Sequence, residues 1–180
     1  MAPKVEAVVG DLRTVMREAG YADGAYQLVL QSYASPFTEN MDPLTHALEG
    51  CPVRIADARW GRTDAVGQLS AALRGVADRT GVRFLDLARA TEGREACNRS
   101  TTQEWVNPLI VDVTQLLKSS DPSHLVQQSF HPNARGHGQL GRCLTEFYAG
   151  DTREGGCLRG SDGNLHAVTG ITAPTALRSA

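Results

Sequence analysis

The sequence lacks long hydrophobic runs and a strong net charge of either sign. Its longest apolar stretches, such as YQLVL at residues 26–30, are far too short to span a bilayer. Aromatic residues make up 6% of the chain, the formal net charge is −2, and no block of basic residues alternates with aromatic ones. We therefore expect no membrane span and no nucleic-acid partner.

Metal-ligand spacing is also absent. The four cysteines are Cys51, Cys97, Cys143 and Cys157. They form no Cys-x-x-Cys pair, and the histidines share no ligand spacing, so we expect no metal ion. An even number of cysteines is compatible with two disulfides in any of three connectivities, or with four reduced thiols, and the sequence does not choose between these alternatives.

The sequence gives conflicting signals about the cellular compartment. The first 20 residues carry six charges and do not resemble a secretory signal peptide, which favours a cytoplasmic protein as the chain is written. Two disulfides would instead favour an oxidising compartment. The sequence leaves this question open.

The order of the elements predicts an α/β protein. With 180 residues, 41% of them hydrophobic, one domain is expected. Periodicity predicts a helix over 3–19, a buried strand within 25–33 and an irregular connection over 34–62. A helix over 63–80 with Thr63 as its N-cap and Gly81 as its stop follows, then a strand within 82–88. Helix, strand, helix, strand is the order of a parallel α/β sheet.

The C-terminal part is harder to interpret. A modest helical pattern lies around 111–117, and a helix over 132–148 has Pro132 in its first turn. We place a boundary at 150: residues 1–150 form the main portion, and residues 151–180 form a tail rich in Gly, Ser and Thr. The tail has a short hairpin around Asp162–Gly163 and a frayed end. Only two clear strands and one further candidate are predicted, so the chain looks like the back half of a larger fold.

Five segments of the chain resemble a known family. They are YQLVLQSYASPF, CPVRIADARW, GVRFLDLARATEGREAC, EWVNPL and SFHPNARGHGQLGRC. In this order they are similar to the C-terminal half of secreted actinobacterial SGNH (GDSL-type) hydrolases, over residues 5–168. The resemblance implies a flavodoxin-like three-layer fold, here without its first strands. It also implies hydrolysis of esters or related acyl bonds by a serine nucleophile, with neither a metal nor an organic cofactor.

By this resemblance, His131 is the catalytic base. A proline directly after a histidine favours an extended backbone, which keeps the ring out of the helix and able to face a cleft. Many family members have an aspartate three residues before this histidine, where the chain has Gln128. Gln128 can accept a hydrogen bond through its side-chain or main-chain carbonyl, as in relatives whose histidine is held by a main-chain oxygen. The alternative for Gln128 is a solvated loop residue.

The family's nucleophile block is missing from this sequence. No Gly-Asp-Ser block, no oxyanion-hole glycine block and no Gly-x-Asn-Asp block precedes the matched region. Five other side chains could replace the missing nucleophile: Ser32, Ser35, Ser129, Cys51 and Cys97. The structural alternative is loop capping for the serines, and a disulfide or core packing for the cysteines. Candidate substrate-binding residues are Tyr33, Ser35 and Trp105, the two aromatics having core or loop packing as the alternative.

Three hypotheses about function follow. The first is a serine ester hydrolase acting on a small ester or acyl substrate, with its front half absent here and His131 as general base. The second is a repurposed or degenerate relative that serves as a binding, assembly or biosynthetic accessory protein without esterase activity. A structural domain with no site is the third. A half-domain exposes apolar surface, so we expect either a homo-oligomer or a missing N-terminal half.

Overall fold

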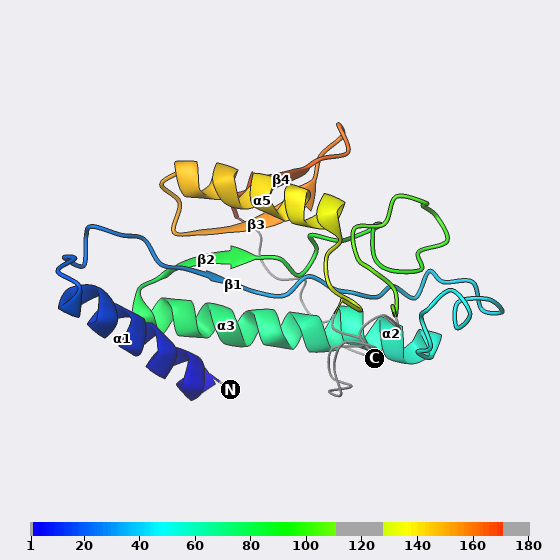
Figure 1. The fold of residues 1–180 in the computed structure, drawn as a ribbon, viewed down its shortest axis with the longest axis horizontal. Coiled ribbons are helices and arrows are strands. Elements are labelled where there is room, and N and C mark those ends of the chain that lie inside the picture. The colour runs from blue at the N-terminus through cyan, green and yellow to red at the C-terminus, as the bar shows by residue number, and fades with distance from the viewer. Residues whose placement is uncertain (1, 111–127, 171–180) are drawn as a thin grey trace, which may run out of the picture.

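The computed structural model describes residues 2–110 and 128–170, arranged as an α/β fold (Figure 1). The helix predicted around 111–117 and the frayed last ten residues lie outside these ranges. The elements in chain order are α1 (Ala2–Glu18), β1 (Val29–Gln31), α2 (Ile55–Trp60), the π-helical turn η1 (Gly61–Ala65), α3 (Val66–Thr80), β2 (Arg83–Asp86), α5 (Ala134–Ala149), β3 (Glu154–Arg159) and β4 (Leu165–Val168).

The described strands form one mixed sheet in the order β1-β2-β3-β4. β1, β2 and β3 are parallel to one another, with Leu30 opposite Phe84 and Leu85 opposite Gly155. β4 runs antiparallel to β3. The α/β class predicted from the element order is thus confirmed, and the sheet has more strands than the sequence indicated.

Helices cover both faces of the sheet. Successive residues of β2 point to opposite sides, as in any strand. On one side Phe84 packs with Leu73 and Ala77 of α3 and with Val9 of α1, and on the other Leu85 packs with Cys143 and Phe147 of α5. Figure 1 shows the resulting layers, with α1 and α3 below the strands and α5 above them.

The helix that precedes β2 begins earlier than the sequence predicted. It starts at Ile55 as α2 and continues through η1 into α3 without a break. Thr63 is therefore not an N-cap: its hydroxyl donates to the carbonyl oxygen of Arg59, four residues back within the helix, at 2.9 Å. The end was predicted correctly, since Gly81 stops the helix in the left-handed conformation with φ of 71°.

α5 begins two residues later than expected. Its N-cap is Asn133, whose side-chain oxygen accepts a hydrogen bond from the backbone N–H of Gly136 at 3.0 Å. Pro132 therefore precedes the helix and does not lie in its first turn.

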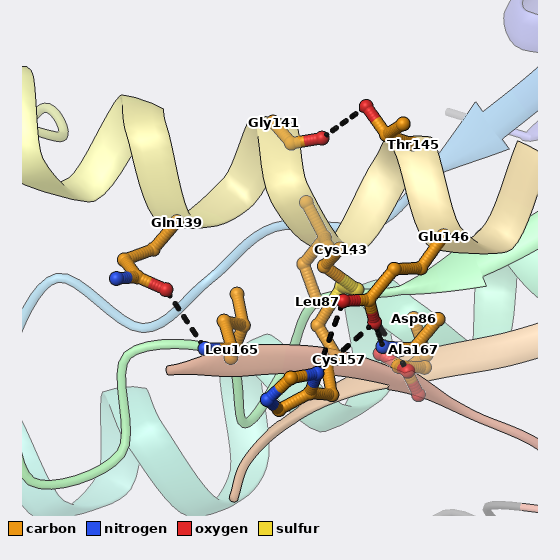
Figure 2. Close-up of a disulfide and its surroundings, with 12 residues drawn as sticks. Asp86, Leu87, Gln139, Gly141, Cys143, Thr145, Glu146, Cys157, Leu165 and Ala167 are labelled. Carbon is orange, nitrogen blue, oxygen red and sulfur yellow. Dashed lines mark hydrogen bonds and ion pairs between the residues drawn. A yellow bond between two sulfur atoms is a disulfide. The ribbon is translucent and has the colours of Figure 1, made fainter. Parts of the chain in front are cut away.

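The predicted hairpin exists and belongs to the sheet. β3 and β4 are joined by a turn in which Gly163 has φ of 81°, and the β3 strand pairs directly with β2. Figure 2 shows how α5 holds the hairpin: a disulfide joins Cys143 to Cys157, and Glu146 accepts from the backbone N–H of Ala167 at 2.9 Å. Residues 154–168 of the presumed tail are thus part of the same core as the rest.

No helix within the described ranges combines the length and the apolar character that a bilayer crossing requires.

Candidate functional site

The histidine predicted to be catalytic lies on the turn that leads into α5. The turn is held against residues 104–107. The backbone N–H of Asn133 donates to the carbonyl of Trp105 at 2.8 Å, and its side-chain N–H donates to the carbonyl of Glu104 at 2.8 Å. The N-terminal end of α5 lies on the side of the molecule toward which β2 points (Figure 1). Loops at the carboxyl ends of parallel strands are where α/β proteins place their sites.

The ring of His131 is oriented by a main-chain oxygen. Its Nδ1 lies 2.8 Å from the carbonyl oxygen of Ser129. A carbonyl oxygen only accepts hydrogen bonds, so Nδ1 carries the proton in the neutral ring and Nε2 carries the lone pair. The side chain is exposed to solvent. His131 therefore presents a proton acceptor to the outside, in one defined tautomer.

Gln128 does not supply the orienting oxygen. Its side chain is exposed, and its main-chain carbonyl accepts a hydrogen bond from Nδ2 of Asn107 at 3.3 Å. Asn107 also binds the turn through its backbone, donating to the carbonyl of His131 at 2.9 Å and accepting from the N–H of Phe130 at 3.1 Å. Asn107 is thus the main clamp on the histidine turn. Asn107 lies within the segment EWVNPL, where no local sequence pattern indicates this role.

Phe130 adopts a backbone conformation that is rare for a residue with a side chain. Its φ is 59°, in the left-handed region. Such strain persists only where surrounding contacts enforce it, and it concentrates at functional sites. Here the enforcing contacts are the two backbone hydrogen bonds of Asn107 and a ring contact with Phe37 at 4.7 Å between centroids. The ring contact also brings the segment after β1 against the histidine turn.

The three candidate serine nucleophiles are buried and already hydrogen-bonded. Ser32 donates to Asp86 at 2.8 Å and accepts from the N–H of Leu87 at 2.7 Å. Ser129 donates to the carbonyl and accepts from the N–H of a single residue, Ile110. The hydroxyl of Ser35 donates to the carbonyl of Phe37 at 2.8 Å. Each hydroxyl therefore stabilises a loop through its hydrogen bonds in this structure.

The candidate cysteine nucleophiles are joined to each other. Cys51 bonds to Cys97, and Cys143 bonds to Cys157, so the described residues contain no free thiol. This settles the connectivity that the sequence left open. All four cysteines are buried, the first pair beside Met41 and Val106 and the second pair in the core between α5 and β3.

The candidate substrate-binding residues differ in accessibility. Trp105 is 3% exposed and packs in the core with Leu87 and Phe147, while Tyr33 is 67% exposed. Ser35 is buried, and its carbonyl accepts from the hydroxyl of Thr91 at 2.6 Å. Of the three, Trp105 is tied to the histidine turn through its carbonyl, and Ser35 lies two residues before the Phe37 that contacts Phe130.

Asp86, at the end of β2, caps the loop that follows the strand. Its Oδ1 accepts from the hydroxyl of Ser32 and from the backbone N–H of Ala88 at 2.9 Å. Another carboxylate, Glu95, is almost fully buried and accepts from Nδ2 of Asn98 at 2.9 Å. Burial raises the pKa of Glu95. Glu95 therefore belongs to the interior of the loop that follows β2, and none of its hydrogen bonds among the described residues reaches His131.

A second histidine connects the hairpin to α5. Nδ1 of His166 lies 3.0 Å from Glu146 on α5, and Nε2 lies 3.1 Å from Asp162 in the hairpin turn. Gly160 makes room for the ring, since a Cβ there would lie 2.9 Å from Cδ2 of His166. No group of three or more His, Cys, Asp and Glu side chains in residues 2–110 and 128–170 is arranged to hold a metal ion. His166 therefore forms hydrogen bonds and ion pairs with Glu146 and Asp162, which connect the hairpin to α5.

The His166 contacts predict a stability maximum at mildly acidic pH. The hydrogen bonds to Asp162 and Glu146 raise the pKa of His166 above its ordinary value of 6.5. This contribution is fully present below pH 6.5 and is lost as the pH rises through the folded-state pKa. The pKa values of Glu146 and Asp162 are lowered, by the N–H of Ala167 and by Asn164 respectively, so their contribution is lost as the pH falls below their ordinary values of 4.5 and 3.8.

Urea unfolding followed between pH 4 and 9 tests this expectation. The difference in unfolding free energy between the native chain and His166→Gln should be largest near pH 5–6 and should shrink toward pH 9. Asp162→Asn should lower the His166 pKa measured by NMR. A difference that stays constant over the whole pH range would contradict the assignment.

Comparison with known proteins gives no relative on which to base a function. No protein-family model, no curated protein and no solved structure matches the chain.

Proposed function

We propose that the chain carries the general-base portion of a serine ester hydrolase of the SGNH type, with His131 as the proton acceptor. One observation carries the proposal. The exposed ring of His131 is tied through Nδ1 to the main-chain oxygen of Ser129, at 2.8 Å, which leaves Nε2 free to accept a proton. Serine hydrolysis requires an imidazole in this tautomer.

The surroundings of the ring support the same role. The turn is strained at Phe130, clamped by Asn107 and attached to a buried tryptophan carbonyl, so the ring is held by rigid structure. In the proposed reaction, Nε2 takes the proton of a serine hydroxyl as that oxygen attacks the carbonyl carbon of an ester. The proton then passes to the departing alkoxide, and a water molecule releases the acyl group by the same route.

The nucleophile comes from polypeptide outside the described residues. The five side chains considered as replacements are either hydrogen-bonded within the loops or joined in disulfides. The substrate class is a small ester or acyl compound, as the resemblance implies, and neither a metal nor an organic cofactor takes part. The two disulfides favour an oxidising compartment, in agreement with the resemblance to secreted hydrolases.

A second candidate function is a relative that binds without hydrolysing, as an assembly or biosynthetic accessory protein. This candidate is favoured because every candidate nucleophile is either hydrogen-bonded or joined in a disulfide. The two candidates differ in what precedes Met1 in the gene. A reading frame that continues upstream and encodes a Gly-Asp-Ser block favours the hydrolase, whereas a stop codon there favours the accessory protein.

The decisive experiment is p-nitrophenyl acetate hydrolysis by the whole gene product, including any residues encoded ahead of Met1. We expect His131→Ala to lower kcat by about 10⁴-fold or more, because the members of a catalytic triad act as a unit. His137→Ala is the matched control, since His137 is also exposed and lies in the first turns of α5. It should leave kcat unchanged. Equal activity of His131→Ala and the native protein would refute the assignment.

A further inference from the structure

α1 exposes an apolar row next to the side that packs on the core. Val8, Leu12 and Val15 are 54%, 46% and 59% exposed. Their spacings of four and three residues put them on one side of the helix. Val9 lies about a quarter turn around the helix from this row, is 6% exposed and packs with Leu73 and Ala77 of α3. Three adjacent apolar side chains form a continuous strip, which distinguishes them from scattered surface residues.

Charged residues follow one flank of this row. Lys4, Asp11 and Glu18 are seven residues apart and exposed, so they line the same side of the helix. The ion pairs of α1 use other residues: Arg17 contacts Asp23, and Glu6 contacts Arg79. In the described part of the chain, no ion pair includes Lys4, Asp11 or Glu18. The flank therefore has a positive end, a negative centre and a negative end, all facing solvent.

We propose that α1 pairs antiparallel with α1 of a second copy of this chain. The pattern is symmetric about residues 11 and 12. A two-fold axis at this point places Val8 against Val15 of the partner subunit and brings the two Leu12 side chains together. Because a two-fold axis keeps the same flank of both helices on the same side, Lys4 then lies against Glu18 of the partner subunit, and the reverse pair forms at the other end.

The same symmetry brings Asp11 close to its own copy at the centre. Two like charges at this distance oppose association, while the two Lys4–Glu18 pairs favour it. The strip is also short for a permanent interface, so the dimer is weak, with a dissociation constant on the order of 10–100 μM. This inference does not depend on the proposed function, because α1 and the histidine turn share no residue.

Charge reversal combined with mixing tests the pairing in sedimentation equilibrium between about 10 μM and 1 mM protein at low salt. Lys4→Glu alone and Glu18→Lys alone should each weaken self-association about threefold to tenfold, since each homodimer then has two repulsive pairs. An equimolar mixture of the two variants should associate as tightly as the native chain, because both pairs are attractive in the mixed dimer. Asp11→Asn should tighten the native dimer.

A variant of the apolar row and a matched control complete the design. Leu12→Ser should weaken self-association about tenfold or more, since both copies lose the contact. Leu44→Ser removes a leucine that is 87% exposed and lies outside α1, and it should change nothing. A chain that stays monomeric up to about 1 mM overturns the proposal, as does a dimer in which the mixture of charge variants associates no better than either variant alone.

Discussion

Reducing the two disulfides is expected to lower the free energy of unfolding by several kcal/mol. The Cys143–Cys157 bond spans 14 residues and Cys51–Cys97 spans 46. In the loop-entropy view of cross-links, these separations correspond to about 3 and about 4 kcal/mol. A domain of this size is typically stable by only about 5–15 kcal/mol, so the reduced chain should lose much or all of its folded population.

The position of each bond explains why its loss is severe. Cys143–Cys157 joins α5 to β3, which lies beside β2, so it fixes one helical layer to the sheet (Figure 2). Cys51–Cys97 joins two loops that have little regular structure of their own, before α2 and after β2. Those loops meet around a small cluster that includes Met41, Ala96 and Val106.

Urea unfolding with and without reductant measures this effect, and paired Cys→Ala variants separate the two bonds. We expect the Cys51→Ala/Cys97→Ala variant to lose slightly more stability than Cys143→Ala/Cys157→Ala, because its loop is longer. Peptide mapping under non-reducing conditions checks the pairing independently. A different pairing, or equal midpoints for the oxidised and reduced protein, would contradict the assignment.

Elements with strong local signals could be predicted from the sequence. The periodic valines and Leu12 predicted α1, Gly81 predicted the end of α3, and Asp162–Gly163 predicted the hairpin turn. Each of these signals operates within a few residues of the chain. The predicted start of the helix that precedes β2 was wrong. The hydroxyl of Thr63 is suited to an N-cap, but threonine is also tolerated inside a helix. There its hydroxyl bonds to the carbonyl four residues back.

Features that depend on distant residues could not be predicted in the same way. The position of β3 beside β2 depends on how α5 crosses the sheet. No local pattern in residues 151–180, which were predicted to be a tail, indicates this pairing. The pairing of cysteines depends on which loops meet, and four cysteines permit three arrangements. At the site, His131 was named from its motif, but the clamp formed by Asn107 joins residues about 20 positions apart. Only the folded chain reveals such a contact.

The glycines of α5 differ sharply in their surroundings. A Cβ at Gly136 would lie 2.1 Å from the carbonyl oxygen of Trp105 and 3.1 Å from Pro132. Backbone atoms cannot turn aside as a flexible side chain does, so Gly136→Ala has to push the first turn of α5 away from residues 104–107. That shift strains the hydrogen bonds of Asn133 and loosens the turn that carries His131.

We expect Gly136→Ala to lower the free energy of unfolding by about 1–3 kcal/mol, the usual cost of overpacking. Gly138 and Gly141 are the matched controls, because they lie in the same helix and a Cβ at either meets nothing within 4 Å. Alanine at these positions should raise stability by about 0.5–1 kcal/mol each, since alanine favours helix and restricts the unfolded chain.

Urea denaturation of the three single variants, followed by circular dichroism, gives the comparison directly. The opposite sign is the decisive feature, because helix propensity alone predicts that all three alanines stabilise the protein. An NMR spectrum of the imidazole nitrogens adds a local readout: Gly136→Ala should mix the His131 tautomers, and Gly138→Ala should not. Stabilisation by Gly136→Ala would mean that α5 does not rest on the Trp105 carbonyl, and the anchoring of the histidine turn would then have to be explained by other contacts.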